Sequence, residues 1–228
     1  PEPVKRNLEN DVIKGMLEAG EPIYGYCSPE YVKDVGTVER VNQTLADIER
    51  GVIAGKCLKN KQRCIFMDRD GTINQYKGLV YKGEDFTLED CAVDAIRKIN
   101  QSGRLGIVIT NQPVVARGLC EIEDVENIHK KMETLLGKEG VFLDDVFYCP
   151  HHPDKGYPEE NPAYKTPCEC RKPKTGMIQK AAERYNIDLA GSWMIGDTTM
   201  DIQTGINAGM RTALVQTGEA GNDKKYDV

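Results

Sequence analysis

The sequence lacks any apolar run near the roughly 20 residues that a membrane-spanning helix requires, and its first residues show no signal-like pattern. It also lacks a surplus of basic residues, since the net charge is −6 and the isoelectric point is near 5.3. This balance argues against a nucleic-acid backbone as the main partner, while leaving room for a small anion on a local basic cluster. We therefore expect no membrane and no nucleic-acid partner. Because the chain begins at Pro1 rather than at Met, we expect a processed or excised piece.

The eight cysteines would suit a disulfide scaffold in a small secreted chain, but this chain of 228 residues is neither very small nor signal-tagged. Three of them, Cys149, Cys168 and Cys170, lie together in the segment "CPHHPDKGYPEENPAYKTPCECRKPK" at 149–174. The other five are scattered, and we interpret them as reduced thiols of a cytoplasmic protein: Cys27, Cys57, Cys64, Cys91 and Cys120.

From residue 61 onward, short apolar runs alternate with helical periodicity. This alternation predicts an α/β domain over 61–228, with a parallel sheet covered by helices on both faces. Such sheets bind ligands at the carboxyl ends of their strands, where Asp68, Thr110 and Asp197 fall. The expected strands are 64–68, 104–110, 143–149, 192–197 and 211–218, and the expected helices are 88–100, 121–137, 175–187 and 199–209.

Residues 1–60 do not share this alternation. Their pattern predicts one helix over 8–20, a second over 37–55 and at most one short strand. Thr37 can cap the second helix, but Arg40 stands where a capping box needs Glu or Gln. Two helices and one short strand cannot bury a sizeable core by themselves. This segment must therefore pack on the rest of the protein or on something absent from the chain.

The segment "FMDRDGTIN" at 66–74 carries the strongest chemical signal. A strand delivers Asp68 to its end, and a turn at Gly71 brings Asp70 close by, with Thr72 able to fix the turn. Two carboxylates this close repel unless a divalent cation lies between them, and oxygen ligands suit Mg²⁺. One Asp could then attack phosphorus, while the other protonates the leaving oxygen and activates water. A surface turn with two Asp residues is the weaker interpretation.

Three further segments supply polar groups, although each alone would be read as ordinary surface. "GDTTMD" at 196–201 offers Asp197 for the metal, and Asp201 to brace the loop or a lysine. "IVITNQ" offers Thr110, whose hydroxyl and backbone N–H can hold a phosphoryl oxygen, and Asn111 beside it. "CRKPK" offers Lys172 as a point charge for a transferring phosphate and Arg171 as a fork for a second anion.

Taken in order, these four segments resemble the motifs of the haloacid dehalogenase superfamily of phosphatases. The resemblance implies a three-layer Rossmann-like fold. It implies that Asp68 is the nucleophile, Asp70 the general acid and base, and Thr110 and Lys172 further catalytic groups. It also implies Mg²⁺ on Asp68, Asp197 and the backbone carbonyl of Asp70, with Asp201 completing the fourth motif.

The intervals between the motifs leave no room for a cap domain, so the loop at 149–174 is the available element to shape the site. Its thiolate and imidazole groups favour Zn²⁺, and four of them would fill a tetrahedral site without leaving a position for water. The set is Cys149, His151, Cys168 and Cys170. His152 is a rival ligand, and a Cys168–Cys170 disulfide is the poorer alternative in a reducing compartment.

The pieces "CPHHP", "CECRKP" and "TNQPVVARG" resemble one branch, the D-glycero-D-manno-heptose-1,7-bisphosphate 7-phosphatases and related histidinol-phosphate phosphatases. The resemblance covers about residues 61–220. It implies zinc on those four residues and substrate contacts from Asn111, Arg117 and Arg171. Two departures touch substrate recognition. Pro113-Val114 replaces the usual Ser-Gly, and Thr198 stands where some relatives carry Lys.

Residues 1–60 resemble the C-terminal end of sugar-1-phosphate nucleotidyltransferases, through "YVKDVGTVERV" at 31–41. This resemblance implies a fused partner domain and, by analogy, the α anomer of the bisphosphate. Other functions stay open. Histidinol-phosphate phosphatase shares the zinc loop, polynucleotide 3′-phosphatase fits the first two motifs but lacks a basic stripe, and an inactive zinc-held interaction module conflicts with the intact acidic motifs.

Overall fold

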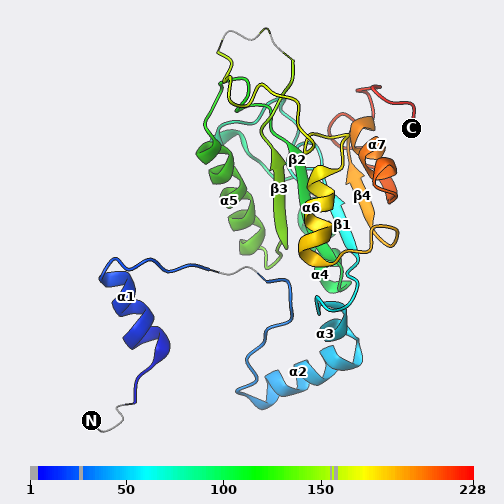
Figure 1. Cartoon of the computed structure of the whole chain (residues 1–228). Helices are drawn as coiled ribbons and strands as arrows, with labels where there is room; N and C mark the ends of the chain where they lie inside the picture. The colour runs from blue at the N-terminus through cyan, green and yellow to red at the C-terminus, as the bar shows by residue number, and fades with distance from the viewer. Residues whose placement is uncertain (1–4, 26–27, 155, 157–158) are drawn as a thin grey trace.

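The computed structural model describes residues 5–25, 28–154, 156 and 159–228. Five parallel strands form one sheet in the order β3-β2-β1-β4-β5 (Figure 1). The chain winds outward from β1 to β3, then returns and continues on the other side of β1. This reversal leaves a crevice between β1 and β4 at the carboxyl ends of the strands. The strands are β1 Cys64–Met67, β2 Leu105–Asn111, β3 Asp145–Cys149, β4 Trp193–Gly196 and β5 Arg211–Leu214.

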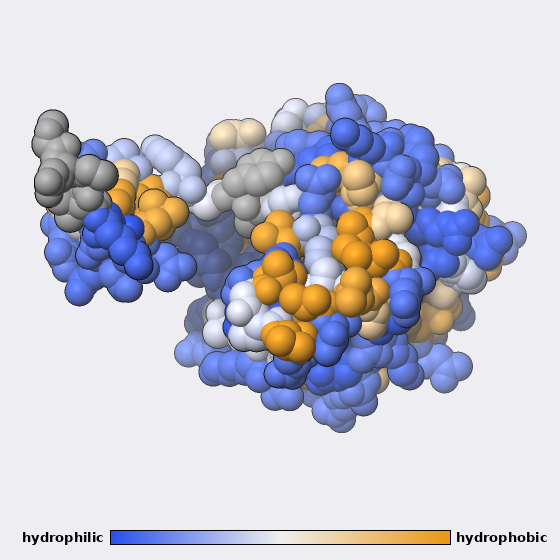
Figure 2. All heavy atoms as spheres, turned by 90° about the horizontal axis from the view of Figure 1, so that it is seen from below, coloured by the Kyte–Doolittle hydropathy of each residue, from blue (hydrophilic) through white to orange (hydrophobic). Residues whose placement is uncertain are grey.

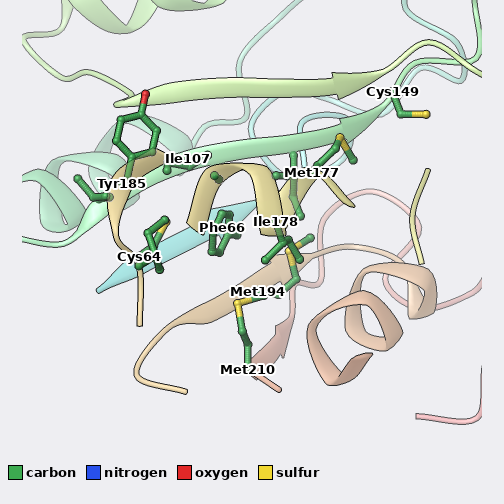
Figure 3. Close-up of a cluster of buried hydrophobic side chains, with 13 residues drawn as sticks. Cys64, Phe66, Ile107, Cys149, Met177, Ile178, Tyr185, Met194 and Met210 are labelled. Atoms are coloured by element: carbon green, nitrogen blue, oxygen red, sulfur yellow. The ribbon is translucent and has the colours of Figure 1, made fainter. Parts of the chain in front are cut away.

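Alternate residues of β1 point to opposite faces, and both faces are buried. Phe66 packs with the helix α6 (Gly176–Tyr185), and Figure 3 shows Met177, Ile178 and Tyr185 of that helix against the sheet. On the other face, buried side chains of α4 (Ala92–Gln101) and α5 (Ile122–Lys138) pack over Met67. The helix α7 (Thr199–Asn207) packs on β4 and β5. These three layers confirm the predicted α/β fold.

The predicted elements of 61–228 all form, with shifted ends. The last strand stops at Leu214 rather than at 218, because the chain leaves the sheet to cross the site. The helix predicted from 88 begins at Ala92, after a turn. A short 3₁₀ helix, Gly83–Asp85, lies in the segment between β1 and α4.

One prediction for residues 1–60 was wrong. The helix expected over 37–55 is divided into α2 (Val38–Glu49) and α3 (Val52–Gly55), because Gly51 takes a left-handed conformation with φ of 74°. The Thr37 hydroxyl does cap α2 by accepting from the backbone N–H of Arg40. The helix expected over 8–20 opens with a π-helical turn, Leu8–Ile13, and continues as α1 (Lys14–Glu18).

The described part of 1–60 buries little against the sheet domain. Helix α2 lies below the sheet in Figure 1 and has no buried residue. Figure 2, which views the molecule from that side, shows apolar side chains gathered on the surface. Exposed apolar residues also recur at helical spacing along α2: Val38, Val41, Leu45 and Ile48. None of the helices in the described residues is both long and apolar enough to cross a membrane.

Candidate active site

The carboxyl ends of three strands bring the predicted acidic and polar residues together. Asp68 follows β1, Thr110 lies near the end of β2 and Asp197 follows β4. They adjoin a cleft of about 350 Å³ whose walls also come from the loop before α6 and from the C-terminal segment. The predicted site residues that line this cleft are Asp68, Asp70, Asn111, Arg117, Arg171, Lys172 and Asp197.

Lys172 joins the first and fourth motifs. Its ammonium lies 2.8 Å from Asp68 Oδ1 and 2.5 Å from Asp201 Oδ1, and all three side chains are almost completely buried. Asp201 also accepts from the hydroxyl and the backbone N–H of Thr198, so its role here is to brace Lys172 and the start of α7. Thr198 is thus a helix cap at the position where the branch resemblance expects Lys in some relatives.

The carboxylate of Asp197 is held in a narrow space. Its Oδ2 accepts from the backbone N–H of Glu219 at 2.8 Å. A Cβ added to Gly71 or to Gly218 would lie 2.2 Å or 2.1 Å from this oxygen, and both glycines have positive φ. The other oxygen, Oδ1, is buried and has no hydrogen-bond partner. Such an orphaned acceptor is costly unless a cation or another donor satisfies it.

The charges of the site favour a divalent cation. Carboxylate oxygens of Asp68, Asp197 and Asp201 lie within 4.8 Å of one another, and the ammonium of Lys172 contacts Asp68 and Asp201. Burial raises the pKa of Asp68 to about 7 although Lys172 opposes the shift, and Asp201 and Asp70 raise it further. Burial likewise raises the pKa of Asp197 to about 6. Oxygen ligands with surplus negative charge fit Mg²⁺.

Asp70 is neutralised separately, by Arg69. The guanidinium of Arg69 is fully buried and lies 3.0 Å from both carboxylate oxygens of Asp70. The side-chain amides of Gln112 and Asn74 donate to the same carboxylate at 2.8 Å and 3.0 Å. Our sequence interpretation overlooked Arg69 and Gln112. The sequence did contain a signal for them: Asp68 and Asp70 are close neighbours, and each carboxylate needs a cation or a hydrogen-bond donor beside it.

The residues of the second motif hold the site together. Asn111 also lines the cleft, whereas Thr110 is buried and is not part of its lining. The Thr110 hydroxyl accepts from the amide of Gln112 at 2.9 Å. Asn111 accepts from the backbone N–H of Lys172 at 3.0 Å and donates to its carbonyl at 3.3 Å. Asn111 therefore fixes the peptide of Lys172. Arg171, beside it, donates from Nη1 to the carbonyl of His151 and lines the cleft with Arg117.

The predicted zinc ligands converge next to the cleft. Distances between the sulfur atoms of Cys149, Cys168 and Cys170 are 3.0 to 3.5 Å. Nδ1 of His151 lies 3.7 Å from the Cys149 sulfur and 3.4 Å from that of Cys170. A tetrahedral zinc with Zn–S bonds of about 2.3 Å requires S···S separations of about 3.8 Å, so small adjustments would admit the ion. Hydrogen bonds from Cys149 and Cys168 lower the pKa of Cys170 to about 5, which favours the metal-binding thiolate.

The two alternatives for this loop do not hold. Nδ1 of His152, the rival ligand, accepts from the backbone N–H of Asp154 at 3.1 Å, and His152 is not part of the cluster. The sulfur atoms of Cys168 and Cys170 are 3.3 Å apart, far beyond the bonded distance of about 2.05 Å. The donor set of three thiols and one imidazole matches a structural zinc site.

The sequence interpretation also missed the C-terminal segment 215–226. It crosses the carboxyl ends of the strands, where Thr217 donates to the carbonyl of Gly71 at 2.6 Å. Asp223 accepts from the backbone N–H and the hydroxyl of Thr199, at 2.7 Å and 2.8 Å. Asp223 and Lys225 consequently line the cleft. No local pattern in 215–226 predicts these long-range contacts.

Fold and site together define a hydrolase of the haloacid dehalogenase type, and residues 169–227 match the family model described as HAD-hydrolase-like. The chain is 39% identical over 156 residues to the D-glycero-beta-D-manno-heptose-1,7-bisphosphate 7-phosphatase of Yersinia pestis, covering 68% of this chain and 81% of that one. It is 40% identical over 156 residues to the Escherichia coli K12 protein of the same name, covering 68% and 80%. The chain belongs to this family of heptose-bisphosphate phosphatases within the haloacid dehalogenase superfamily.

Solved structures agree with this assignment. The D,D-heptose 1,7-bisphosphate phosphatase from B. bronchiseptica, crystallised with magnesium and phosphate, is 36% identical. It superposes with a TM-score of 0.61 over 70% of this chain and 83% of that one. A HAD-like phosphatase from Mesorhizobium loti is 32% identical, with a TM-score of 0.61 over 66% and 70%.

Proposed function

We propose that this protein is a Mg²⁺-dependent phosphatase that removes the 7-phosphate of D-glycero-D-manno-heptose 1,7-bisphosphate through an aspartyl-phosphate. The observation that carries the proposal is the buried chain Asp68–Lys172–Asp201 beside the orphaned oxygen of Asp197. It presents a nucleophilic carboxylate, a cation for the phosphate and an incomplete oxygen site in one cleft. The names of the relatives supply the substrate class.

In this mechanism, a carboxylate oxygen of Asp68 attacks the phosphorus of the 7-phosphate. The bond from phosphorus to the sugar oxygen breaks, and Asp70 gives its proton to that oxygen, so that the sugar leaves as an alcohol. Asp70 then takes a proton from water as the water attacks phosphorus, which releases inorganic phosphate and restores Asp68. Arg69, Gln112 and Asn74 hold Asp70 in place for both proton transfers.

Mg²⁺ fits the oxygen set of Asp68, Asp197 and the Asp70 backbone carbonyl, and when bound it would neutralise charge between the carboxylates and the phosphoryl group. Lys172 and Thr110 would contact phosphoryl oxygens in the same region. Lys172 suits that role because the carboxylates of Asp201 and Asp68 outweigh burial and raise its pKa, which keeps the ammonium charged.

Zn²⁺ would be held by Cys149, His151, Cys168 and Cys170, with no position left for a reacting water. We therefore propose a structural role for this metal. The loop it fixes runs directly into Arg171 and Lys172, and it stands where other enzymes need a separate cap. Asn111, Arg117 and Arg171 are proposed to contact the sugar phosphate.

Residues 1–60 are proposed to be the end of a fused nucleotidyltransferase domain. Their exposed α2 and small burial against the sheet domain support this proposal. A nucleotidyltransferase would use the heptose 1-phosphate that the phosphatase makes. The α-anomer expectation depends on this argument alone, whereas the curated relatives carry the β anomer in their names.

A substrate panel tests the proposed function. Both anomers of the bisphosphate and histidinol phosphate are compared by kcat/KM with Mg²⁺ present, and Asp68→Asn is the matched inactive variant. We expect one phosphate released per bisphosphate, and none with Asp68→Asn. Higher kcat/KM on histidinol phosphate, or no turnover of either anomer, would contradict the proposal. Hydrolysis of an aryl phosphate by the wild type would exclude an inactive interaction module.

A further inference from the structure

A bisphosphate substrate brings two anionic groups, and the mechanism above assigns a lysine ammonium, that of Lys172, to only one of them. Lys172 is committed to Asp68, Asp201 and the transferring phosphate. The phosphate that stays on the sugar needs other cations. Thr198, which follows the fourth-motif Asp197, lines the cleft but uses its hydroxyl to cap α7 through Asp201. Thr198 therefore offers no positive charge to that phosphate.

The C-terminal segment returns to the same wall. Thr198 and Lys225 both line the 350 Å³ cleft, and Lys225 also lines an adjoining cavity of about 340 Å³. Arg171 and Lys172 line both spaces as well. Lys225 thus lies where the reacting end of the cleft meets the adjoining cavity. Among the residues that the structure describes, no carboxylate forms an ion pair with its ammonium.

The backbone that carries Lys225 is anchored rather than loose. The hydroxyl of Thr199 accepts from the backbone N–H groups of Lys225 and Tyr226, at 3.1 Å and 3.2 Å. The same hydroxyl donates to Asp223, which also accepts from the Thr199 N–H. Four hydrogen bonds therefore tie the segment to the first residue of α7.

We propose that Lys225 is a specificity-determining residue that, with Arg171, binds the phosphate remaining on the sugar. The inference depends on the proposed function, since it assigns a second site to the same bisphosphate. A lysine suits this task because a compact ammonium on a flexible stem can reach a phosphate oxygen without fixed geometry.

The test compares Lys225→Ala with Lys224→Ala, a control at the neighbouring exposed lysine, which does not line the cleft. Each variant is assayed on heptose 1,7-bisphosphate and on heptose 7-phosphate, which lacks the second phosphate. Loss of one charge-assisted contact typically lowers affinity by roughly tenfold or more. We expect Lys225→Ala to lose about that factor in kcat/KM on the bisphosphate, chiefly through KM, with less than a twofold change on the 7-phosphate. Lys224→Ala should match the wild type on both.

Equal losses on both substrates, or no loss on the bisphosphate, would overturn the inference and leave the proposed function standing. A wild-type enzyme that does not hydrolyse the bisphosphate would instead overturn the proposed function, and this inference with it. As a second variant, Thr198→Lys is combined with Lys225→Ala. Because Thr198 and Lys225 line the same cleft, recovery of bisphosphate kcat/KM in this double variant would support a need for a cation at this place, and activity remaining at the level of Lys225→Ala would contradict it.

Discussion

Replacing Gly218 by Ala should inactivate the enzyme by displacing Asp197, although Gly218 takes no part in the chemistry. The added Cβ would stand 2.1 Å from Asp197 Oδ2 and 2.7 Å from the Cα of Gly71. Ordinary contact requires about 3.5 Å, so the carboxylate must move by more than about 1 Å. Gly71 blocks retreat on one side, and the Glu219 N–H holds the same oxygen.

A displacement of about 1 Å in a catalytic group commonly costs about 100-fold in rate. We therefore expect kcat of Gly218→Ala to fall by about two orders of magnitude, and the Mg²⁺ concentration for half-maximal activity to rise. The left-handed backbone adds a cost of about 1–2 kcal/mol in stability that is unrelated to Asp197. Gly140→Ala separates the two effects, because Gly140 has φ of 70° and nothing within 4 Å of the added Cβ.

The assay is hydrolysis of an aryl phosphate across a Mg²⁺ titration, together with urea unfolding of both variants. Gly140→Ala should lose stability but keep the wild-type kcat and Mg²⁺ dependence. Gly218→Ala should lose stability at least to the same extent and lose activity as well. If both variants keep wild-type activity, Asp197 is not confined by Gly218 and the reasoning fails.

Two further predictions concern the zinc loop and a buried histidine. Cys170→Ser should abolish zinc binding, which metal analysis measures. The variant should also raise KM for the bisphosphate more than it lowers kcat, because the loop carries Arg171 but not the nucleophile. One zinc per chain in the variant would contradict this prediction. Burial and the Arg69 guanidinium lower the pKa of His129 to about 3, below the value of about 6.5 expected in the unfolded chain. The neutral ring therefore stabilises the fold fully above about pH 6.5, and stability falls as the pH drops toward 3, by about 2 kcal/mol at pH 5. Urea unfolding at pH 7 and pH 5 measures this loss, and His129→Gln should reduce it; an equal loss in the variant would refute the assignment.

Residues at strand ends were the most predictable part of the site. Asp68, Thr110 and Asp197 each follow or close an apolar strand, and parallel strands must bring their carboxyl ends to one edge. The sequence therefore contains both the chemistry and the placement of these groups. The Cys/His cluster was nearly as predictable, since three cysteines and a histidine fall in one short loop. The choice between His151 and His152 needed the loop conformation, which directs Nδ1 of His151 to the sulfur atoms.

Residues 37–55 show where periodicity misleads. Apolar positions continue past residue 50 at helical spacing, so one helix was predicted. A glycine within such a pattern costs only about 1 kcal/mol in helix propensity, which is too little to decide the boundary from sequence. In the structure Gly51 takes φ of 74° and ends α2. After the break, the chain continues through α3 to Lys56, whose ammonium lies 3.9 Å from Asp144 Oδ1.

Arg69 shows what a charge argument could have added. Between two functional aspartates, an arginine looks like an exposed turn residue, and sequence pattern gives no reason to bury it. Yet Lys172 can neutralise Asp68 only while it also holds Asp201, so Asp70 requires a cation of its own. Arg69 is the nearest in sequence, and its planar fork can meet both carboxylate oxygens at once. The buried guanidinium of Arg69 also needs a neutral neighbour. His129 stays neutral beside it and accepts a hydrogen bond from Nη1 at 3.2 Å. The site therefore depends on a histidine 60 residues away that no motif contains.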